Sequence, residues 1–314
     1  MSPTGSATTV MGGPGDDQAA ILADRLGRRY GDVTAVESVS LAIRPGEFFA
    51  LLGPNGAGKT TTLHMLTTMV RPTSGTASVF GFDVVRQPHE VRRLLGMVFQ
   101  DPALDDRLTA RENLEIHAVL YGIGRKEREQ VIERALEWAA LTEARDRRVR
   151  SFSGGMKRRL ELARALTHSP KVLFLDEPTI GLDPQGRRNL WEHIDALREG
   201  GMTVLMTTHN LPEAEACDRV GIMDAGRLVA VGTPRELVAR HGGGADGDEA
   251  GDGGAEPGAV DRGGADRRAP EPAPRGADLE DVLIALTGKQ LRDEQATARD
   301  RLVSFAKRGG EHTR

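Results

Sequence analysis

The sequence predicts an α/β protein with a parallel sheet at its core. Short apolar runs alternate with stretches of helical periodicity along the 314 residues. One apolar run, residues 47–52 (EFFALL), leads into a glycine-rich segment that ends in Lys-Thr. Another, residues 171–175 (KVLFL), leads into two carboxylates. Because the carboxyl ends of parallel strands meet at one edge of a sheet, we expect both groups of polar residues at that edge.

Composition and charge exclude several classes of protein. The net charge is −4 and the isoelectric point is near 6.1, so no basic surface indicates a nucleic-acid partner. No apolar stretch approaches the roughly 18 residues of a membrane span, and residues 1–17 lack the basic start and apolar run of a secretion signal. The single cysteine, Cys217, leaves no internal disulfide. We expect a cytoplasmic chain for which any membrane span comes from a partner.

Residues 20–43 predict a small antiparallel sheet that follows a disordered tail over residues 1–18. The short apolar runs of this segment are separated by Gly31 and Asp32 and end before Pro45. Tyr30 lies next to the break. Its ring either stacks on an adenine base or fills one face of the sheet, and the residues alone leave both possibilities open.

Residues 53–60 (GPNGAGKT) fit the phosphate-loop pattern G-x-x-x-x-G-K-[ST]. Glycines let the backbone wrap closely around phosphate oxygens, and a helix that begins inside the motif directs its first amides at the same anion. Lys59 would reach the β- and γ-phosphates of a nucleotide, and the Thr60 hydroxyl would ligate Mg²⁺. The predicted nucleotide contacts in this loop are Gly53, Pro54, Asn55, Gly56, Ala57, Gly58, Lys59, Thr60 and Thr61.

The middle of the chain turns helical after one more apolar run. Residues 96–99 end at Gln100, which either reaches a metal or γ-phosphate or simply satisfies loop backbone. From residue 109 to about 168 the periodicity is helical and opens with a capping box at Thr109 and Glu112, so we expect an all-helical insertion.

A helix is expected to begin at Ser153, Gly154 and Gly155. Serine is a good N-cap, and the two glycines leave the first amides open to an anion, although an ordinary serine-capped helix has the same sequence. The three basic residues at 157–159 are typical of a solvated helix face.

Two carboxylates follow the apolar run at residues 171–175. Such groups are costly at the end of a buried strand unless they meet a cation or a substrate. Asp176 suits a Mg²⁺ ligand, and Glu177 could hold and polarise the attacking water, whereas an acidic helix cap is the alternative. His209 follows the next apolar run, where it either hydrogen-bonds a γ-phosphate or is structural. Asp183 is expected to cap a helix with Pro184 at its first position.

The C-terminal third contains a hairpin over residues 220–231, a capping box at Thr233 and Glu236, and a segment of different composition. Most of residues 241–277 are Gly, Ala or Pro, which predicts a disordered linker. Beyond it a short amphipathic helix is expected between Asp278 as cap and Gly288 as stop. Its apolar residues are Leu279, Val282, Leu283 and Leu286.

Taken together, these motifs resemble the nucleotide-binding subunit of an ABC transporter over roughly residues 20–240. The order is Tyr30, GPNGAGKT at 53–60, Gln100, FSGGM at 152–156, VLFLDEP at 172–178, GLD at 181–183 and His209. The resemblance implies a P-loop NTPase core of parallel strands with an antiparallel β subdomain and a helical subdomain at about 101–168. It implies one ATPase domain at 19–240, and the composition and periodicity described above add the linker at 241–277 and a short helical segment at 278–314.

The resemblance also implies a role for each motif. Tyr30 would stack on adenine, Gln100 would touch Mg²⁺ and sense the membrane partner, and His209 would contact the γ-phosphate as the switch histidine. Residues 153–155 would close on ATP bound to the opposite subunit, and Asp183 would lie at that dimer interface. Phe152 and Met156 depart from the usual Leu-Ser-Gly-Gly-Gln wording of the signature.

The segments FSGGMKRRLELA and LEDVLIALTG are similar to the daunorubicin-resistance type of bacterial exporter ATPase. This resemblance implies a homodimeric, Mg²⁺-dependent ATPase on the cytoplasmic face of the plasma membrane. It would drive drug or antibiotic export through a separate integral membrane permease, without nucleic acid. A soluble non-transport ABC ATPase and an importer ATPase remain alternatives, as does a regulatory module that only binds nucleotide and would not need Glu177.

Overall fold

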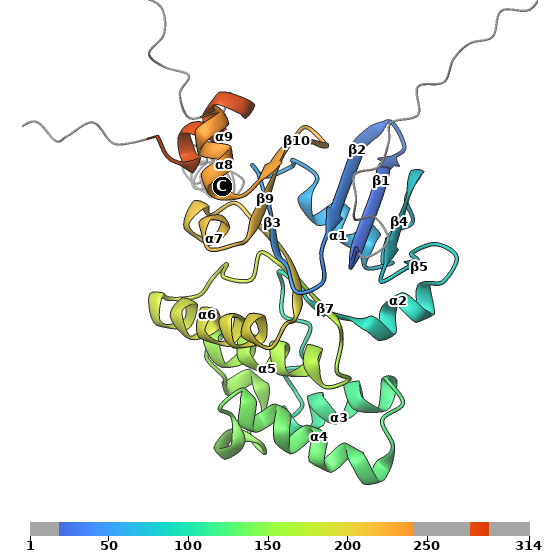
Figure 1. Ribbon diagram of the computed structural model, residues 1–314. Helices are drawn as coiled ribbons and strands as arrows, with labels where there is room; N and C mark the ends of the chain where they lie inside the picture. Colours follow the sequence, from blue (N-terminus) through green and yellow to red (C-terminus); the bar gives the residue numbers. More distant parts are fainter. Residues whose placement is uncertain (1–18, 242–276, 289–314) are drawn as a thin grey trace, which may run out of the picture.

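A computed structural model describes residues 19–241 and 277–288, and a ten-stranded sheet forms its centre (Figure 1). The strand order is β5-β4-β1-β2-β10-β9-β3-β8-β7-β6. The strands are β1 (Ile21–Tyr30), β2 (Val33–Ile43), β3 (Phe48–Leu52), β4 (Ser74–Val79), β5 (Phe82–Asp83), β6 (Leu95–Val98), β7 (Val172–Asp176), β8 (Thr203–Thr208), β9 (Arg219–Asp224) and β10 (Arg227–Gly232).

The predicted parallel core is confirmed. Strand β3 pairs in parallel with β8 and β9, and β7 pairs in parallel with β8 and β6. Every residue of β3, β7 and β8 is buried, because both faces of these strands are covered. Phe49 and Leu51 pack on one side of β3, and Phe48 and Leu52 pack into a different core on the other.

The N-terminal strands form the expected antiparallel sheet. Strand β1 pairs antiparallel with β2 and β4, and β4 continues to β5. The hairpin turns at Gly31, whose φ of 58° favours glycine. A single parallel pair between Arg227 of β10 and Ser38 of β2 joins this part to the core, so the two parts form one sheet.

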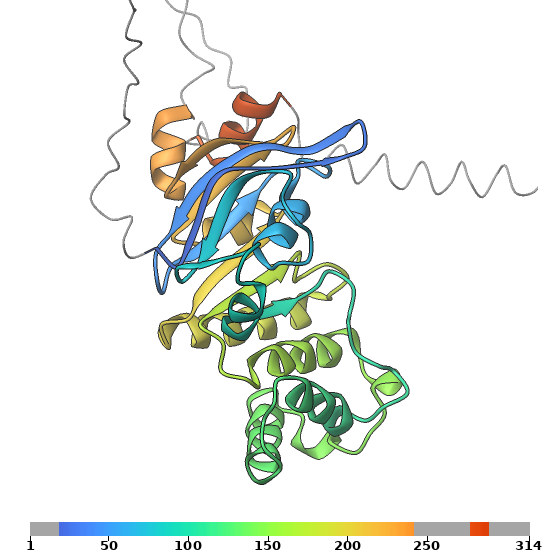
Figure 2. The same ribbon diagram turned by 90° about the vertical axis from the view of Figure 1, so that its right-hand side faces the viewer.

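Helices surround the sheet and build a separate layer at one end. They are α1 (Lys59–Leu66), α2 (Pro88–Leu94), α3 (Ala110–Leu120), α4 (Arg125–Trp138), α5 (Gly154–Leu166), α6 (Pro184–Glu199), α7 (Leu211–Glu215), α8 (Pro234–His241) and α9 (Leu279–Thr287). Helices α3 and α4 lie at the end of the molecule opposite α8 and α9 (Figures 1 and 2).

The helical segment after β6 has its own hydrophobic core. Leu114, Ile132, Leu136 and Leu160 are fully buried together between α3, α4 and α5. The expected capping box opens α3, since the Thr109 side chain accepts from the Glu112 amide and the Glu112 carboxylate accepts from the Thr109 amide. The expected helical insertion is therefore present, with 3₁₀ turns at Thr142–Ala144 and Val149–Ser151.

Helix α9 packs its apolar stripe against α7 and α8. Leu279, Val282 and Leu283 are buried in the same core as Leu237 of α8, and Leu286 lies partly buried beside them. The Asp278 side chain caps the helix, and Gly288 ends it in the left-handed conformation with φ of 66°. The predicted short amphipathic helix is confirmed.

Several expectations lie outside the described residues. These are the disordered tail at 1–18, the linker apart from residues 241 and 277, and the end of the chain at 289–314. The predicted domain boundaries stay predictions. Within the described ranges, no helix combines the length and apolar character needed to cross a membrane.

The buried stripe of α9 predicts a measurable effect on stability. Leu283→Ala should lower the free energy of unfolding by about 2–5 kcal/mol, because it removes a buried side chain and leaves a cavity against α7 and α8. Urea denaturation of the full-length chain measures this change. The exposed neighbour Ala285→Ser is the control and should shift the free energy by less than about 0.5 kcal/mol. Equal, small effects of both substitutions would contradict a packed α9.

Candidate functional site

The phosphate loop connects β3 to α1, and its glycines are needed by the fold as well as by a ligand. Gly56 and Gly58 have φ angles of 81° and 99°, a region that favours glycine. A Cβ at Gly53 would lie 2.2 Å from the Met223 carbonyl oxygen, and one at Gly58 would lie 2.7 Å from the Ala35 carbonyl oxygen. The loop therefore runs too close to neighbouring backbone for side chains at these positions.

Helix α1 begins inside the motif, as expected. Its N-cap is Gly58, which has no side chain with which to cap the first amides of the helix. The first amides of a helix have no partner within the helix, and the positive end of its dipole favours an anion. Residues 55–61 line a pocket together with Gln100 and Glu177. The start of α1 thus offers its first amides to a phosphate, in a pocket that the Glu177 carboxylate also lines.

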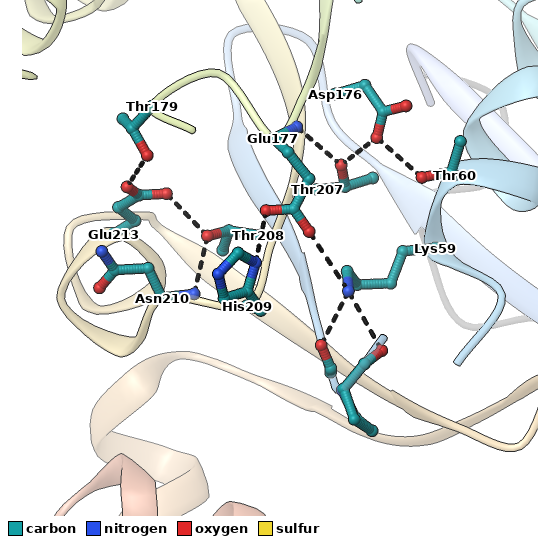
Figure 3. A network of polar contacts seen from close by, with 12 residues as sticks. Lys59, Thr60, Asp176, Glu177, Thr179, Thr207, Thr208, His209, Asn210 and Glu213 are labelled. Atoms are coloured by element: carbon teal, nitrogen blue, oxygen red, sulfur yellow. Dashed lines mark hydrogen bonds and ion pairs between the residues drawn. The ribbon is translucent and has the colours of Figure 1, made fainter. Parts of the chain in front are cut away.

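Lys59 is held at the base of this pocket. Its side chain is only 5% exposed, and its Nζ donates to the carbonyl oxygens of Gly53 at 2.8 Å and Pro54 at 3.2 Å. The same Nζ lies 3.3 Å from Oε1 of Glu177 (Figure 3). The ammonium group is thereby placed between the phosphate loop and the end of β7.

Asp176 links the loop to two neighbouring strands. Its Oδ1 accepts from the hydroxyl of Thr60 at 3.0 Å and from the hydroxyl of Thr207 at 2.5 Å (Figure 3). The pairing of β7 with β8 places Asp176 opposite Thr207 in the register, which brings these groups together. The expected meeting of Asp176 with Thr60 at one sheet edge is confirmed.

Glu177 has an unusual backbone conformation. Its φ of 47° is uncommon for a residue with a side chain and costs on the order of 1–3 kcal/mol. The Glu177 amide donates to the hydroxyl of Thr207 at 3.1 Å, and its carbonyl oxygen accepts from Arg158 at 3.2 Å. This backbone turns the carboxylate back toward Lys59 and His209, where Nδ1 of His209 donates to Oε2 at 2.7 Å.

The electrostatics of the Glu177–His209 pair favour both charged forms. Burial opposes ionisation of Glu177, but the hydrogen bond from His209 and the charge of Lys59 outweigh it and lower the pKa of Glu177 below 4.5. The hydrogen bond to Glu177 raises the pKa of His209 above 6.5, against the effect of burial. Each shift favours the state in which Glu177 is negative and His209 positive.

The described residues fit the groups that the sequence predicts here. The first amides of α1 and Lys59 suit phosphate oxygens, and the oxygens of Thr60 and Asp176, 3.0 Å apart, are hard ligands of the kind that Mg²⁺ prefers. Gln100 is exposed and lines the same pocket. The role of each residue toward nucleotide or metal stays a prediction.

Two predicted residue groups lie away from the phosphate loop. Ser153, Gly154, Gly155 and Asp183 line a different pocket between α5 and α6, which shares no lining residue with the first. Ser153 caps α5 by accepting from the Met156 amide at 3.3 Å, and Asp183 caps α6 by accepting from the Gly186 amide at 2.8 Å. The predicted caps are confirmed, and within one chain they lie outside the phosphate-loop pocket.

Tyr30 also lies outside the lining of the phosphate-loop pocket. Val33, Thr34 and Ala35 at the start of β2 line it, while Tyr30 is 44% exposed and lies 4.4 Å beneath the guanidinium of Arg28. Its stacking on adenine stays a prediction. Cys217 is buried and packed, as expected for a residue without chemistry at the site, and burial raises the pKa of its thiol.

Sequence reasoning missed Glu213 of α7. This carboxylate is 4% exposed and accepts from the hydroxyl of Thr208 at 2.7 Å and from the hydroxyl of Thr179 (Figure 3). The Thr208 hydroxyl in turn accepts from the Asn210 amide at 2.9 Å. Glu213 therefore ties the segment after Glu177 to the turn that carries His209. An acid four residues after a strand-end histidine is the signal that would have revealed it.

The expectation of a solvated basic face at 157–159 is wrong for Arg158. Its side chain is 5% exposed and forms a buried pair with the carboxylate of Glu161, at 3.0 Å. Burial lowers the pKa of Arg158, and burial raises the pKa of Glu161. Helix α5 contacts β6, α3, α4 and α6, so little of its surface is left for water.

The comparisons with known proteins agree with this geometry. Residues 36–180 match the family model described as ABC transporter. The daunorubicin resistance ATP-binding protein DrrA3 of Streptomyces coeruleorubidus is 45% identical over 225 residues, which cover 71% of each chain. The linearmycin resistance ATP-binding protein LnrL of Bacillus subtilis (strain 168) is 41% identical over 224 residues, covering 71% of this chain and 72% of that one.

A solved structure shows the same fold. It is a dimeric ATP-binding cassette in a post-hydrolysis state with ADP and Pi bound. The two chains superpose with a TM-score of 0.62 at 27% sequence identity, over 68% of this chain and 98% of the other.

The Glu177–His209 contact predicts a shift that can be measured without nucleotide. Glu177→Gln should lower the pKa of His209, because a neutral amide replaces the carboxylate whose hydrogen bond and charge raise it, while burial and the charge of Lys59 still lower it. An NMR titration of the histidine ring protons measures the pKa. His168, whose pKa burial lowers and which bonds the Leu95 carbonyl, is the internal control and should not change.

The same pair predicts a pH window for stability. The contribution of Glu177 is full above pH 4.5 and is lost as the pH falls through its lowered pKa. The contribution of His209 is full below pH 6.5 and is lost as the pH rises through its raised pKa. An unchanged His209 titration in Glu177→Gln would contradict the contact and with it this window.

Proposed function

The chain belongs to the family of ABC transporter ATP-binding proteins, and we propose that it is the ATP-hydrolysing subunit of a bacterial exporter. The single observation that carries the hydrolytic part is the Glu177 carboxylate, which lies between Lys59 and His209 beside the phosphate loop. A chain that only binds nucleotide has no need of a buried carboxylate in a strained backbone at this place. The products are ADP and phosphate.

The chemistry follows from these side chains. Glu177 is the general base that holds and polarises the attacking water, since its lowered pKa keeps it ionised at neutral pH. When ATP binds, the Lys59 ammonium group gives up its hydrogen bonds to the loop carbonyl oxygens and binds the β- and γ-phosphates instead. His209 donates to Glu177 and orients that carboxylate beside the γ-phosphate.

The remaining contacts of the phosphate-loop pocket bind and orient MgATP. Residues 53–61 cradle the phosphates, with backbone amides as donors except at Pro54, which has none, and Tyr30 stacks on the adenine. Thr60, Asp176 and Gln100 hold Mg²⁺, which supplies positive charge to the phosphate oxygens when bound. The hydrogen bond between Thr60 and Asp176 supports this ligand set, because it already brings two hard oxygens together.

Two copies of the chain complete each ATP site. The amides at Ser153, Gly154 and Gly155 close on the ATP of the opposite copy, and Asp183 lies at that interface. The separation of the two pockets within one chain supports this arrangement, as does the dimeric cassette with ADP and Pi among the solved structures. The segment from Glu177 to Asp183 runs from one pocket to the other.

Export is supported by the relatives. Their names assign them to resistance against daunorubicin and linearmycin, so we propose drugs, antibiotics or another amphipathic compound as cargo. The chain works at the cytoplasmic face of the plasma membrane with a separate integral membrane permease. These relatives favour export over the alternatives of an importer ATPase and a non-transport ABC protein, which share the motifs.

Paired substitutions test the catalytic assignment. Glu177→Gln should lower kcat by about 10²–10⁴-fold with ATP binding retained, because it removes the base alone. Lys59→Ala should weaken ATP binding itself by about 10–100-fold, because it removes charge-assisted bonds to phosphate. Steady-state hydrolysis and equilibrium binding of ATP measure the two effects, with the exposed Lys126→Ala as control. Near-normal hydrolysis by Glu177→Gln refutes the assignment.

Co-purification tests the transport assignment. The tagged full-length chain is purified from detergent-solubilised native membranes, and its companions are identified by mass spectrometry. We expect a stoichiometric multi-span membrane protein. Ribosomal or DNA-bound companions without a membrane protein would overturn the exporter and leave only the ATPase.

A further inference from the structure

A buried ion pair on α5 is unexplained by the proposed catalytic contacts. Glu161 is 0% exposed and pairs with Arg158 one turn before it, yet neither side chain lines the phosphate-loop pocket or the pocket at Ser153. Burying two charges costs more than packing two apolar side chains unless further hydrogen bonds satisfy both groups. The partners of this pair are therefore informative.

The pair holds the segment around Gln100 at both of its ends. One guanidinium nitrogen of Arg158 donates to the Phe99 carbonyl oxygen at 2.5 Å, and the Ala103 amide donates to Oε1 of Glu161 at 2.7 Å. Arg164, one turn further along α5, donates to the Ala103 carbonyl oxygen at 2.6 Å. Residues 99–103 are thus fixed to α5, with Gln100 between the fixed points.

Arg158 also holds the backbone at the catalytic edge. Its Nε donates to the Pro178 carbonyl oxygen at 2.6 Å, and its second terminal nitrogen donates to the Glu177 carbonyl oxygen at 3.2 Å. These bonds lie beside the left-handed backbone of Glu177, which needs such support to persist. A planar guanidinium can donate in several directions at once, whereas a lysine ammonium on its flexible stem cannot reproduce this set.

We propose that Arg158 and Glu161 form a positioning pair that couples the start of α5, the Gln100 segment and the backbone of Glu177. The pair touches no nucleotide and acts through Glu177. When residues 99–103 or α5 move, the Arg158 side chain then transmits the movement to the carboxylate of Glu177. The proposal rests on the proposed ATPase function for its kinetic consequences, but the position of Glu177 is defined without nucleotide.

The first experiment compares Arg158→Lys with Lys157→Met in the full-length chain. Lys157 lies next to Arg158 and forms a surface ion pair with Asp106 at 2.8 Å, so its loss removes one positive charge from the same helix. In Arg158→Lys we expect kcat for ATP to fall about tenfold or more while KM changes less than about threefold. We expect Lys157→Met to keep the wild-type kcat and KM.

The second readout is the NMR titration of His209 without nucleotide. If Arg158 places Glu177, Arg158→Lys lowers the pKa of His209 toward 6.5, and Lys157→Met leaves it unchanged. A purely structural role would not shift this pKa in a protein that is folded. The titration also separates the two proposals, because a wild-type chain without ATPase activity would refute the proposed function and leave this test intact.

The outcomes are decisive in each direction. A fall in kcat together with a shift of the His209 pKa supports the positioning pair. A wild-type kcat together with an unshifted pKa of His209 overturns the proposal. It is also overturned if Arg158→Lys impairs kcat, KM and the thermal midpoint to a similar extent. If Arg158→Lys does not fold, the double variant Arg158→Met/Glu161→Met removes both charges at similar volume, and it should fold and show the same two effects. Wild-type values in that double variant also overturn the proposal.

Discussion

The site depends on keeping two carboxylates at the buried end of β7. Asp176 is the last residue of β7, a strand with no exposed residue, and Glu177 follows it, so an unpaired charge at either position would be expensive. Each carboxylate is matched by donors from other elements: the threonine hydroxyls for Asp176, and Lys59 and His209 for Glu177. Because the donors come from α1, β8 and the turn after β8, the charges align these elements as well as performing chemistry.

Residues of α7 and α5 hold the segments that carry these charged side chains. Glu213 fixes the turn that carries His209 from the N-terminal part of α7, and α9 packs its buried stripe against α7 and α8. On the other side, Arg158 reaches from α5 to the carbonyl oxygen of Glu177. The strained φ of Glu177 persists because bonds to both its amide and its carbonyl leave it little freedom.

Much of this arrangement could be predicted from sequence, because it rests on local rules. The phosphate loop, the caps at Thr109, Ser153 and Asp183, and the apolar runs of β3 and β7 are each legible within a few residues. The common sheet edge follows from parallel topology. That is why the meeting of Asp176 with Thr60 was expected even though 116 residues separate them.

What escaped prediction depends on packing around an element rather than on its own pattern. Arg158 is indistinguishable from its basic neighbours in sequence, and only the elements that enclose α5 make it a buried donor. The separation of the two pockets was expected only from the family resemblance, since the spacing of motifs does not say whether they meet in one chain or between two.

In the proposed dimer each chain supplies half of each ATP site, and this can be tested by the mass of the Glu177→Gln protein in solution. Sedimentation equilibrium with and without MgATP measures that mass. We expect a shift from 33.8 kDa to twice that value when MgATP is added, because slow hydrolysis lets the closed dimer accumulate. A chain that binds MgATP and stays at the monomer mass at every concentration would contradict it.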